Sequence, residues 1–227
     1  FITSACPAVN RMIQLYYPEA LQFLAPVDSP MLAHVKMLKA ARPQAKVVFI
    51  GPCIAKKREG RESGIVDGVL TFEDLKRFFE EKGVDVKNIA RFAADGGGDV
   101  NRAKYYPISR GIIKSFDKYA DGYEYVAVDG ADKCREVLEN IGSLSGMFLE
   151  LNSCEYACVN GPCSLIHKGS AVKANAAIRK YTNKDLENKV SRKIETPDGV
   201  SFAREYKRMR PDDRIPSERE IAEILAR

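Results

Sequence analysis

Short apolar runs, each bounded by turn residues, recur along the chain and predict buried β-strands. Four such runs are residues 46–51 (KVVFIG), the Gly-Val-Leu run around Val69, residues 123–130 (YEYVAVDG) and residues 146–152 (GMFLELN). Continuous runs of β-branched and aliphatic residues, without polar alternation, are typical of strands covered on both faces, as in parallel sheets.

The intervals between these runs carry the periodicity of amphipathic helices. The clearest case covers residues 71–83, with Thr71 as a candidate N-cap, acidic residues in the first turn and Gly83 to end it. A second helix is expected over residues 131–142, and we expect Cys134 on it to pack or to face solvent rather than to bind a metal. Strand followed by helix, repeated, predicts an α/β fold of mainly parallel sheets flanked by helices.

Composition indicates an ordinary globular protein. Of the 227 residues, 45% are hydrophobic and 30% are charged, and the chain has no apolar run of membrane-spanning length and no signal peptide. We therefore expect a cytoplasmic protein with reduced cysteines and no membrane contact.

Basic residues gather in three runs, residues 56–61, 189–193 and 204–210, within a net charge of +5. Acidic residues are interspersed in two of these runs and no nucleic-acid-binding motif accompanies them, so we expect no nucleic-acid partner. A basic patch of this kind suits an acidic electron-transfer partner instead.

Four of the six cysteines fall in three short segments: Cys6, Cys53, and the pair Cys154 and Cys158. Zinc ribbons and many ferredoxin sites use C-x2-C pairs, and this chain has none. Ligands this far apart in sequence converge only when the fold brings them together. Two of the predicted strands run into these cysteines, which would place a metal beyond the carboxyl ends of parallel strands. Thiolates bind zinc as well as iron-sulfur clusters, although the spacing disfavours zinc.

Three segments, residues 2–7 (ITSACP), 51–59 (GPCIAKKRE) and 149–161 (LELNSCEYACVNG), resemble the signature segments of the catalytic domain of FeFe-hydrogenases. In that family the segments read approximately TSCCP, MPCxxKxxE and ExMACxxGCxxGGG, in this order. Residues 18–21 (PEAL) and 29–31 (SPM) are similar to further stretches of the same domain. The chain is identified as a member of this family, and the resemblance implies two lobes around a cluster site.

The resemblance also implies a ligand set. Cys6, Cys53, Cys154 and Cys158 would hold a 4Fe-4S cluster. Cys158 would bridge that cluster to a diiron site that carries CO, cyanide and a dithiolate.

Polar residues near the diiron site receive roles from the same resemblance. Lys56 would donate to a cyanide ligand, and such a charge-assisted hydrogen bond gains strength away from water. Ser29 matches a serine that lies near the bridging dithiolate. Glu59 and Glu150 match acidic positions of the second and third segments.

Several positions depart from the family pattern. Ala5 stands where the family has the cysteine that relays protons to the diiron site, and Ala25 stands where a relay serine is usual. Gly51 and Asn152 replace two methionines, so we expect a more open and more polar pocket. Cys163 adds a thiol after the last ligand and is a candidate substitute for the missing proton carrier.

A general acid-base step needs a proton carrier within reach of the reacting atom, so we expect slow, reversible chemistry of protons and hydrogen, as in the sensory branch of the family. The implied redox partner is a ferredoxin or an iron-sulfur domain of the same chain. Two alternatives stay open: an iron-sulfur scaffold or assembly factor of the same superfamily, and a zinc or purely structural site. Lys56 and Ser29 favour the hydrogenase interpretation over the scaffold.

The chain divides into two expected parts. Residues 1–192 would form a partial catalytic domain, because the chain starts directly before the first motif and resembles a fragment. Residues 193–227 would form a helical extension that leads to signalling modules downstream. Its clearest helix is expected over residues 216–227, where Ser217 and Glu220 form a candidate capping box.

Overall fold

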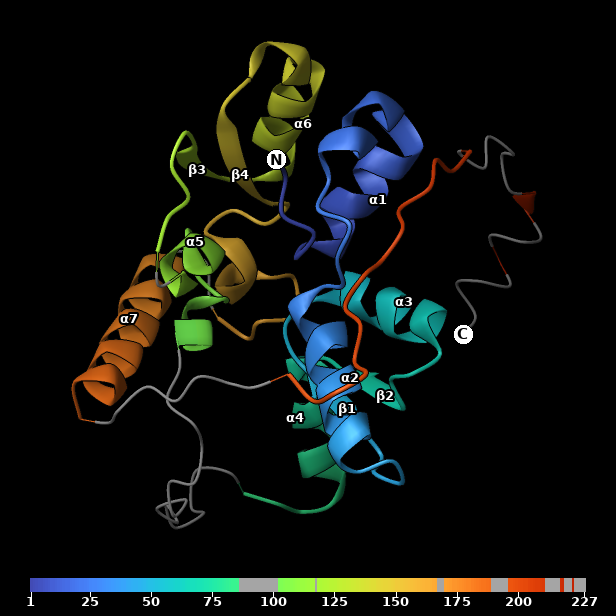
Figure 1. Ribbon diagram of the computed structural model, residues 1–227. Helices are drawn as coiled ribbons and strands as arrows, with labels where there is room; N and C mark the ends of the chain where they lie inside the picture. The colour runs from blue at the N-terminus through green and yellow to red at the C-terminus, as the bar shows by residue number, and fades with distance from the viewer. Residues whose placement is uncertain are drawn as a thin grey trace.

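A computed structural model describes residues 1–85, 102–116, 118–166, 170–188 and 196–210, together with residues 217, 218 and 222 (Figure 1). Its α-helices are α1 (Pro7–Tyr16), α2 (Pro30–Ala41), α3 (Ile54–Ser63), α4 (Phe72–Glu81), α5 (Gly111–Ser115), α6 (Ala131–Glu139) and α7 (Ala171–Asn188). Short 3-10 helices are η1 (Pro18–Phe23), η2 (Arg102–Tyr105), η3 (Ile141–Ser143) and η4 (Ala157–Asn160). None of the described helices is both long enough and apolar enough to cross a membrane.

The strands form two separate parallel pairs. β1 (Val48–Ile50) pairs with β2 (Gly68–Leu70), and β3 (Glu124–Asp129) pairs with β4 (Met147–Asn152). All four strands lie within the predicted apolar runs, so the predicted α/β fold with parallel strands is confirmed.

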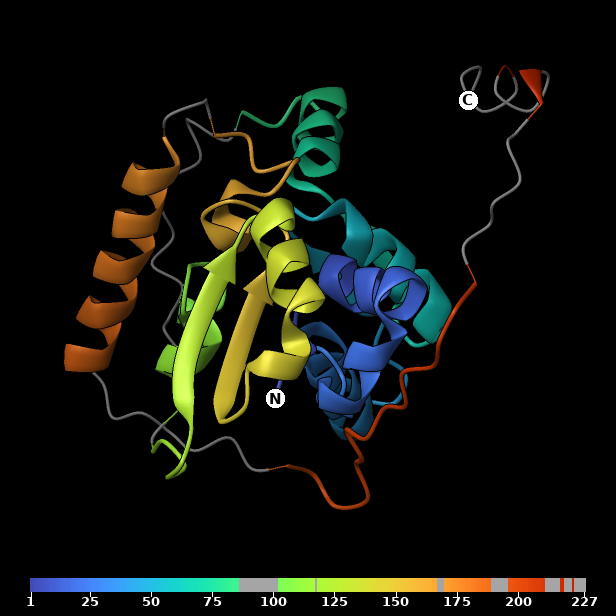
Figure 2. The same cartoon turned by 90° about the horizontal axis from the view of Figure 1, so that it is seen from above.

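Each strand pair has its own helical cover. Figure 2 shows α6 between the β3–β4 pair and α1, while α3 and α4 lie by the β1–β2 pair (Figure 1). The main core fills the space between α1, α6 and the inner face of β3–β4. Its most deeply buried members are Ile2, Val9, Ile13, Leu138, Leu149 and Leu151.

Residues 1–3 extend the β3–β4 pair as a short third segment. The Thr3 N–H donates to Leu149 O at 2.9 Å, and the Leu149 N–H donates to Phe1 O at 2.7 Å. The bridge between Ile2 and Leu149 is parallel. The chain after residue 3 therefore leaves the sheet at the same edge as the chain after β4.

Both helices predicted in detail are confirmed. α4 starts with a reciprocal capping box, in which Thr71 Oγ1 accepts from the Asp74 N–H at 3.0 Å and Asp74 Oδ2 accepts from the Thr71 N–H at 2.8 Å. α6 carries Cys134 on its buried face, and the Cys134 thiol has no exposed surface. Cys134 packs in the core, as expected.

Residues 196–210, here called the C-terminal strap, are extended and lie across the end of the molecule that holds α1, α2 and α3 (Figure 1). Backbone hydrogen bonds join the strap to residues 26–28: the Arg204 N–H donates to Pro26 O, and the Asp28 N–H donates to Phe202 O. The predicted division between residues 192 and 193 lies outside the described residues. Of the helix predicted over residues 216–227, the described residues Glu218 and Ala222 are helical.

Truncation of a core leucine tests this packing. Leu151→Ala is expected to lower the free energy of unfolding by about 2–5 kcal/mol, because it leaves a cavity between β4 and the helices. Leu38→Ala removes the same atoms from a side chain that is 38% exposed, and is expected to cost less than about 1 kcal/mol. Urea denaturation of both variants makes the comparison, and equal losses would contradict the burial of Leu151.

Candidate functional site

The four cysteines predicted as ligands, here called the four-cysteine set, come from separate segments that end at neighbouring places. Cys6 follows residues 1–3 and is the N-cap residue of α1, and Cys154 follows the parallel strand β4. Because both segments leave the sheet at its carboxyl edge, these two cysteines emerge on the same side. All four thiols are free.

Cys53 reaches the same region from the other strand pair. It follows β1 and is the N-cap residue of α3. Burial raises the pKa of the Cys53 thiol, while the nearby backbone N–H groups of Lys56 and Ala55 and the positive charge of Lys56 act in the opposite direction. Helix N-termini stabilise thiolates, the form in which cysteine binds metals.

A close backbone contact joins the Cys53 segment to the Cys158 segment. A Cβ atom at Gly161 would lie 2.8 Å from Pro52 O and 3.0 Å from Cys158 O, so only glycine fits at this position. The Cys163 N–H also donates to Pro52 O at 3.1 Å. These contacts hold the segment that carries Cys158 against the segment that carries Cys53.

The thiols lie within electrostatic range of one another. Burial, together with the nearby thiols of Cys6 and Cys53, raises the pKa of Cys154 to about 11 and that of Cys158 to about 12. Like charges that raise a pKa are close neighbours in a site of low dielectric constant. Cys154 and Cys158 therefore keep their protons at neutral pH until a cation compensates the negative charge of the thiolates.

In the described part of the chain, which includes the whole set, no group of three or more His, Cys, Asp or Glu side chains is arranged to hold a metal ion. Zinc would require four sulfurs at about 2.3 Å from one point, whereas a 4Fe-4S cluster binds each thiolate at a different iron. The zinc alternative therefore gains no support from the structure.

The loop between the last two cysteines has a constrained backbone. Tyr156 and Ala157 are consecutive residues with φ of 62° each, in the left-handed region. This conformation costs roughly 1–2 kcal/mol for each residue other than glycine. Strain of this kind is characteristic of functional loops, where the surrounding structure maintains it.

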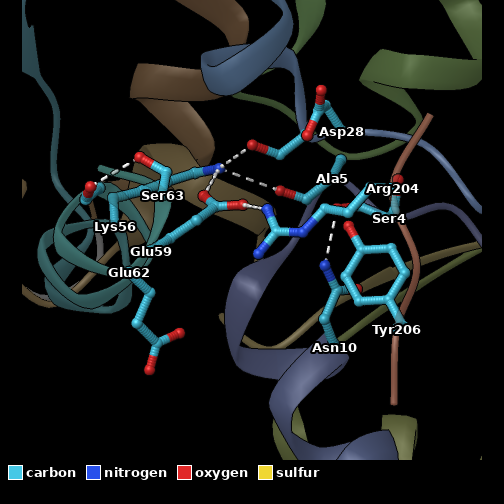
Figure 3. A network of polar contacts seen from close by, with 12 residues as sticks. Ser4, Ala5, Asn10, Asp28, Lys56, Glu59, Glu62, Ser63, Arg204 and Tyr206 are labelled. Atoms are coloured by element: carbon cyan, nitrogen blue, oxygen red, sulfur yellow. Dashed lines mark hydrogen bonds and ion pairs between the residues drawn. The ribbon is translucent and has the colours of Figure 1, made fainter. Parts of the chain in front are cut away.

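A buried lysine lies beside the four-cysteine set and lowers the pKa of Cys158 through its charge. Its ammonium group donates to Glu59 Oε2 at 2.6 Å, to Ser29 Oγ at 3.0 Å and to Ala5 O at 3.4 Å (Figure 3). Lys56 and Glu59 lie on adjacent turns of α3, and Ser29 precedes α2. Ser29 is fully buried, and its hydroxyl does not cap α2. The hydroxyl instead accepts the hydrogen bond from Lys56.

Sequence reasoning missed one member of this network. Arg204, on the C-terminal strap, donates to Glu59 Oε1 at 3.3 Å (Figure 3). The sequence places Arg204 in the basic run 204–210, which was expected to suit an acidic electron-transfer partner. No local signal in the sequence pairs it with a glutamate 145 residues away.

Glu150 belongs to a different polar group, on the face of β4 toward α5. Its side chain is fully buried, and its carboxylate accepts from the Ile113 N–H at 3.0 Å and from Asn152 Nδ2 at 3.4 Å. Asn152 Nδ2 also donates to Asp129 Oδ1 at 3.0 Å. Burial raises the pKa of the Glu150 carboxyl, although these hydrogen bonds lower it in part.

Comparison with known families decides the assignment. Residues 1–125, more than half of the chain, match the family described as iron only hydrogenase large subunit, C-terminal domain. The chain belongs to this family.

A curated relative agrees with the family. This chain is 28% identical over 166 residues to the periplasmic Fe hydrogenase large subunit of Nitratidesulfovibrio vulgaris. The match covers 62% of this chain and 39% of that protein. The chain thus spans about two fifths of the length of the curated relative.

Solved FeFe-hydrogenase structures share the fold. A variant of HydA1 from Chlamydomonas reinhardtii superposes with a TM-score of 0.65 at 15% identity, covering 91% of this chain and 76% of that chain. A HydA structure concerned with stepwise H-cluster assembly gives a TM-score of 0.63 at 15% identity, covering 92% and 76%. Similarity at this level of identity supports the fold alone.

Positions that depart from the hydrogenase pattern lie as follows. The Cys163 thiol is near Glu73 and Thr71 at the start of α4, and Glu73 rather than the four-cysteine set adds to the raising of its pKa by burial. Ala25 is buried. The Phe49 ring occupies the space beside Gly51, where a Cβ atom would lie 2.8 Å from it. The Phe49 side chain of β1 therefore fills the space that a side chain at position 51 would take.

The buried carboxyl of Glu150 predicts a pH-dependent stability difference. Its pKa is raised in the folded state, so protonation favours folding, and this contribution is lost as the pH rises through the folded pKa. Relative to Glu150→Gln, the wild type is expected to lose stability progressively from about pH 4 upward. Urea unfolding across this range measures the difference.

The exposed Glu136→Gln is the matched control, and is expected to stay within about 0.5 kcal/mol of wild type. A wild type that gains stability relative to Glu150→Gln as the pH rises would contradict the raised pKa.

Proposed function

We propose that this domain holds a 4Fe-4S cluster on Cys6, Cys53, Cys154 and Cys158, with Cys158 bridging to a diiron site that carries CO, cyanide and a dithiolate. That cofactor would supply reversible conversion of protons and hydrogen. The observation that carries the proposal is the convergence of four thiols from distant segments beside a buried ammonium group. Family membership supports the same cofactor.

The chain's own residues would perform three tasks. Cys6 and Cys53 would supply two of the four ligands from the N-termini of α1 and α3, and the backbone N–H groups of Lys56 and Ala55 act to lower the pKa of Cys53. Gly161 allows the Cys158 segment to approach Cys53 closely. Lys56 offers an anionic ligand a charge-assisted hydrogen bond from a position shielded from water.

Proton delivery is the task for which the expected residues are lacking. Ala5 and Ala25 have no proton to transfer, and Ala5 contributes only its carbonyl group to Lys56. We leave Cys163 out of the proposal, because its thiol lies against Glu73 and Thr71. Slow turnover suits a sensory role, in which the state of the cofactor is the signal.

The proposal extends to the redox partner, the downstream modules and the location of the protein. A ferredoxin or an iron-sulfur domain of the same chain would exchange electrons with the cluster. A sensory protein would couple the domain to downstream signalling modules, and we propose a cytoplasmic location. The proposed conversion of protons and hydrogen involves no nucleic-acid or membrane partner.

Cysteine variants test the ligand set. After anaerobic reconstitution with iron and sulfide, Cys53→Ala and Cys154→Ala are expected to lose most of the bound iron and the cluster signal in electron paramagnetic resonance. Each variant removes one of the four ligands, and hydrogen bonds from the surrounding residues do not replace a thiolate. Cys163→Ala is the matched control and is expected to keep the wild-type iron content. Equal iron in all three variants would refute the ligand set.

A scaffold function is the second candidate, favoured by the missing proton carrier and by the polar Asn152 at the end of β4, two residues before Cys154. Infrared spectra of protein matured anaerobically separate the two. Bands of metal-bound CO and cyanide that shift under hydrogen support the hydrogenase proposal. An intact 4Fe-4S cluster without these bands supports the scaffold.

Restoring the relay thiol tests the account of slow turnover. In protein with a loaded diiron site, Ala5→Cys is expected to raise hydrogen evolution by about 10²-fold or more, because a positioned proton carrier contributes about this much. Ala8→Cys, which adds a thiol at the next turn on α1, is the control and is expected to leave the rate unchanged. An unchanged rate in loaded Ala5→Cys would show that proton delivery is not the limit.

A further inference from the structure

Two cations share one buried carboxylate beside the four-cysteine set. Glu59 is 4% exposed and binds Lys56 through Oε2 at 2.6 Å and Arg204 through Oε1 at 3.3 Å (Figure 3). Each carboxylate oxygen therefore serves one cation. The orientation of Glu59 is fixed from both sides, and through Glu59 so is the ammonium group of Lys56.

The charges of this trio do not cancel. Lys56 and Arg204 carry two positive charges against the single negative charge of Glu59. Without Arg204, Lys56 and Glu59 would form a neutral pair, and the ammonium group would have little attraction left for another anion. With Arg204 in place, the trio keeps one net positive charge. This net positive charge would attract an anionic ligand that lies beside Lys56.

Arg204 is delivered by the C-terminal strap. The Arg204 N–H donates to Pro26 O at 3.0 Å, and its guanidinium lies 5.1 Å from the centre of the Tyr206 ring. The Tyr206 hydroxyl donates to Val27 O at 3.0 Å. These contacts place the guanidinium over Glu59 only when the strap is docked.

The strap also controls a second partner of the lysine. The Asp28 N–H donates to Phe202 O at 2.8 Å, and the next residue is Ser29, whose hydroxyl accepts from Lys56. Two of the three acceptors around the ammonium group, Glu59 and Ser29, are therefore held by one segment. A strap that lifts away would release both.

Water would then reach the carboxylate. A cavity of about 320 Å³ lies between α1, α3 and the strap, and Glu59 and Arg204 both line it. Loss of the guanidinium would open this cavity toward Glu59. The Lys56 ammonium group would exchange its acceptors for water.

We propose that Arg204 is a positioning residue, which acts through Glu59 to hold the Lys56 ammonium group in place beside the four-cysteine set. Docking of the C-terminal strap thereby sets the position of the Lys56 ammonium group. The consequence for an anionic ligand rests on the proposed function, whereas the positioning itself does not. A signal that reaches residues 196–210 would be transmitted to the site by this route.

Nitrogen-15 spectra of lysine ammonium groups in the 227-residue chain test the proposal. A buried, triply hydrogen-bonded ammonium group exchanges its protons slowly enough to give a signal, and Lys56→Met identifies it by loss. Arg204→Gln is expected to abolish this signal or to shift it by more than its linewidth. Arg204→Lys, which keeps the charge, is expected to restore it in part.

Lys207→Gln is the matched control, because it also removes one positive charge from the strap, at an exposed side chain that pairs with Glu205 rather than with Glu59. It is expected to leave the Lys56 signal unchanged. A Lys56 signal that persists unaltered in folded Arg204→Gln overturns the proposal. Equal losses in Arg204→Gln and Lys207→Gln also overturn it, since removal of any positive charge from the strap would then account for the effect.

A measurement on the wild type covers the case in which Arg204→Gln does not fold. In urea below the unfolding transition, the Lys56 signal and the exchange protection of the Arg204 amide are expected to be lost at the same concentration. A Lys56 signal that outlasts strap protection contradicts the proposal. Iron content is measured separately, so absence of a cluster with a strap-dependent Lys56 signal refutes the proposed function and leaves the positioning role standing.

Discussion

The parallel alignment of residues 1–3 with β4 is the constraint on which the site depends. Parallel neighbours end at the same edge of a sheet, so Cys6 and Cys154 emerge together although 148 positions of sequence separate them. The close approach of Gly161 to Pro52 then ties this edge to the other strand pair, where Cys53 begins α3. Neither contact alone would gather four thiols. Together they make the ligand set a property of the fold rather than of a local motif.

Buried charged side chains are the second feature that shapes the site. Lys56, Glu59 and Glu150 are all buried, and burial of an ionised group is tolerated only with partners. The lysine and Glu59 satisfy one another and recruit Arg204, whereas Glu150 relies on hydrogen bonds from a backbone N–H and from Asn152. The first group pairs opposite charges, whereas burial pushes the Glu150 carboxyl toward neutrality. The two buried polar groups thus differ in character.

Much of the fold was predictable because its signals are local. The four strands lie in uninterrupted apolar runs, and the capping residues of α4 are only three apart. The convergence of the cysteines followed from strand direction. Other features depend on side-chain packing and leave no trace in the sequence: the pairing of Arg204 with Glu59, the Phe49 ring beside Gly51, and the placement of Cys163 against Glu73. In each case the neighbours of the residue in the fold, rather than its sequence pattern, determine what it contacts.

The starts of the helices show how this domain distributes its stability. α1, α2 and α3 begin at Cys6, Ser29 and Cys53, and none of these residues closes its helix with a side-chain hydrogen bond. A good N-cap contributes about 1 kcal/mol, so three helices give up part of their stability where the lysine and the thiols meet. α4 has a complete cap outside that region. Fraying at these three helix starts should therefore be easier than at the start of α4, which makes the backbone beside the lysine and the thiols more pliable than the backbone at that capped helix.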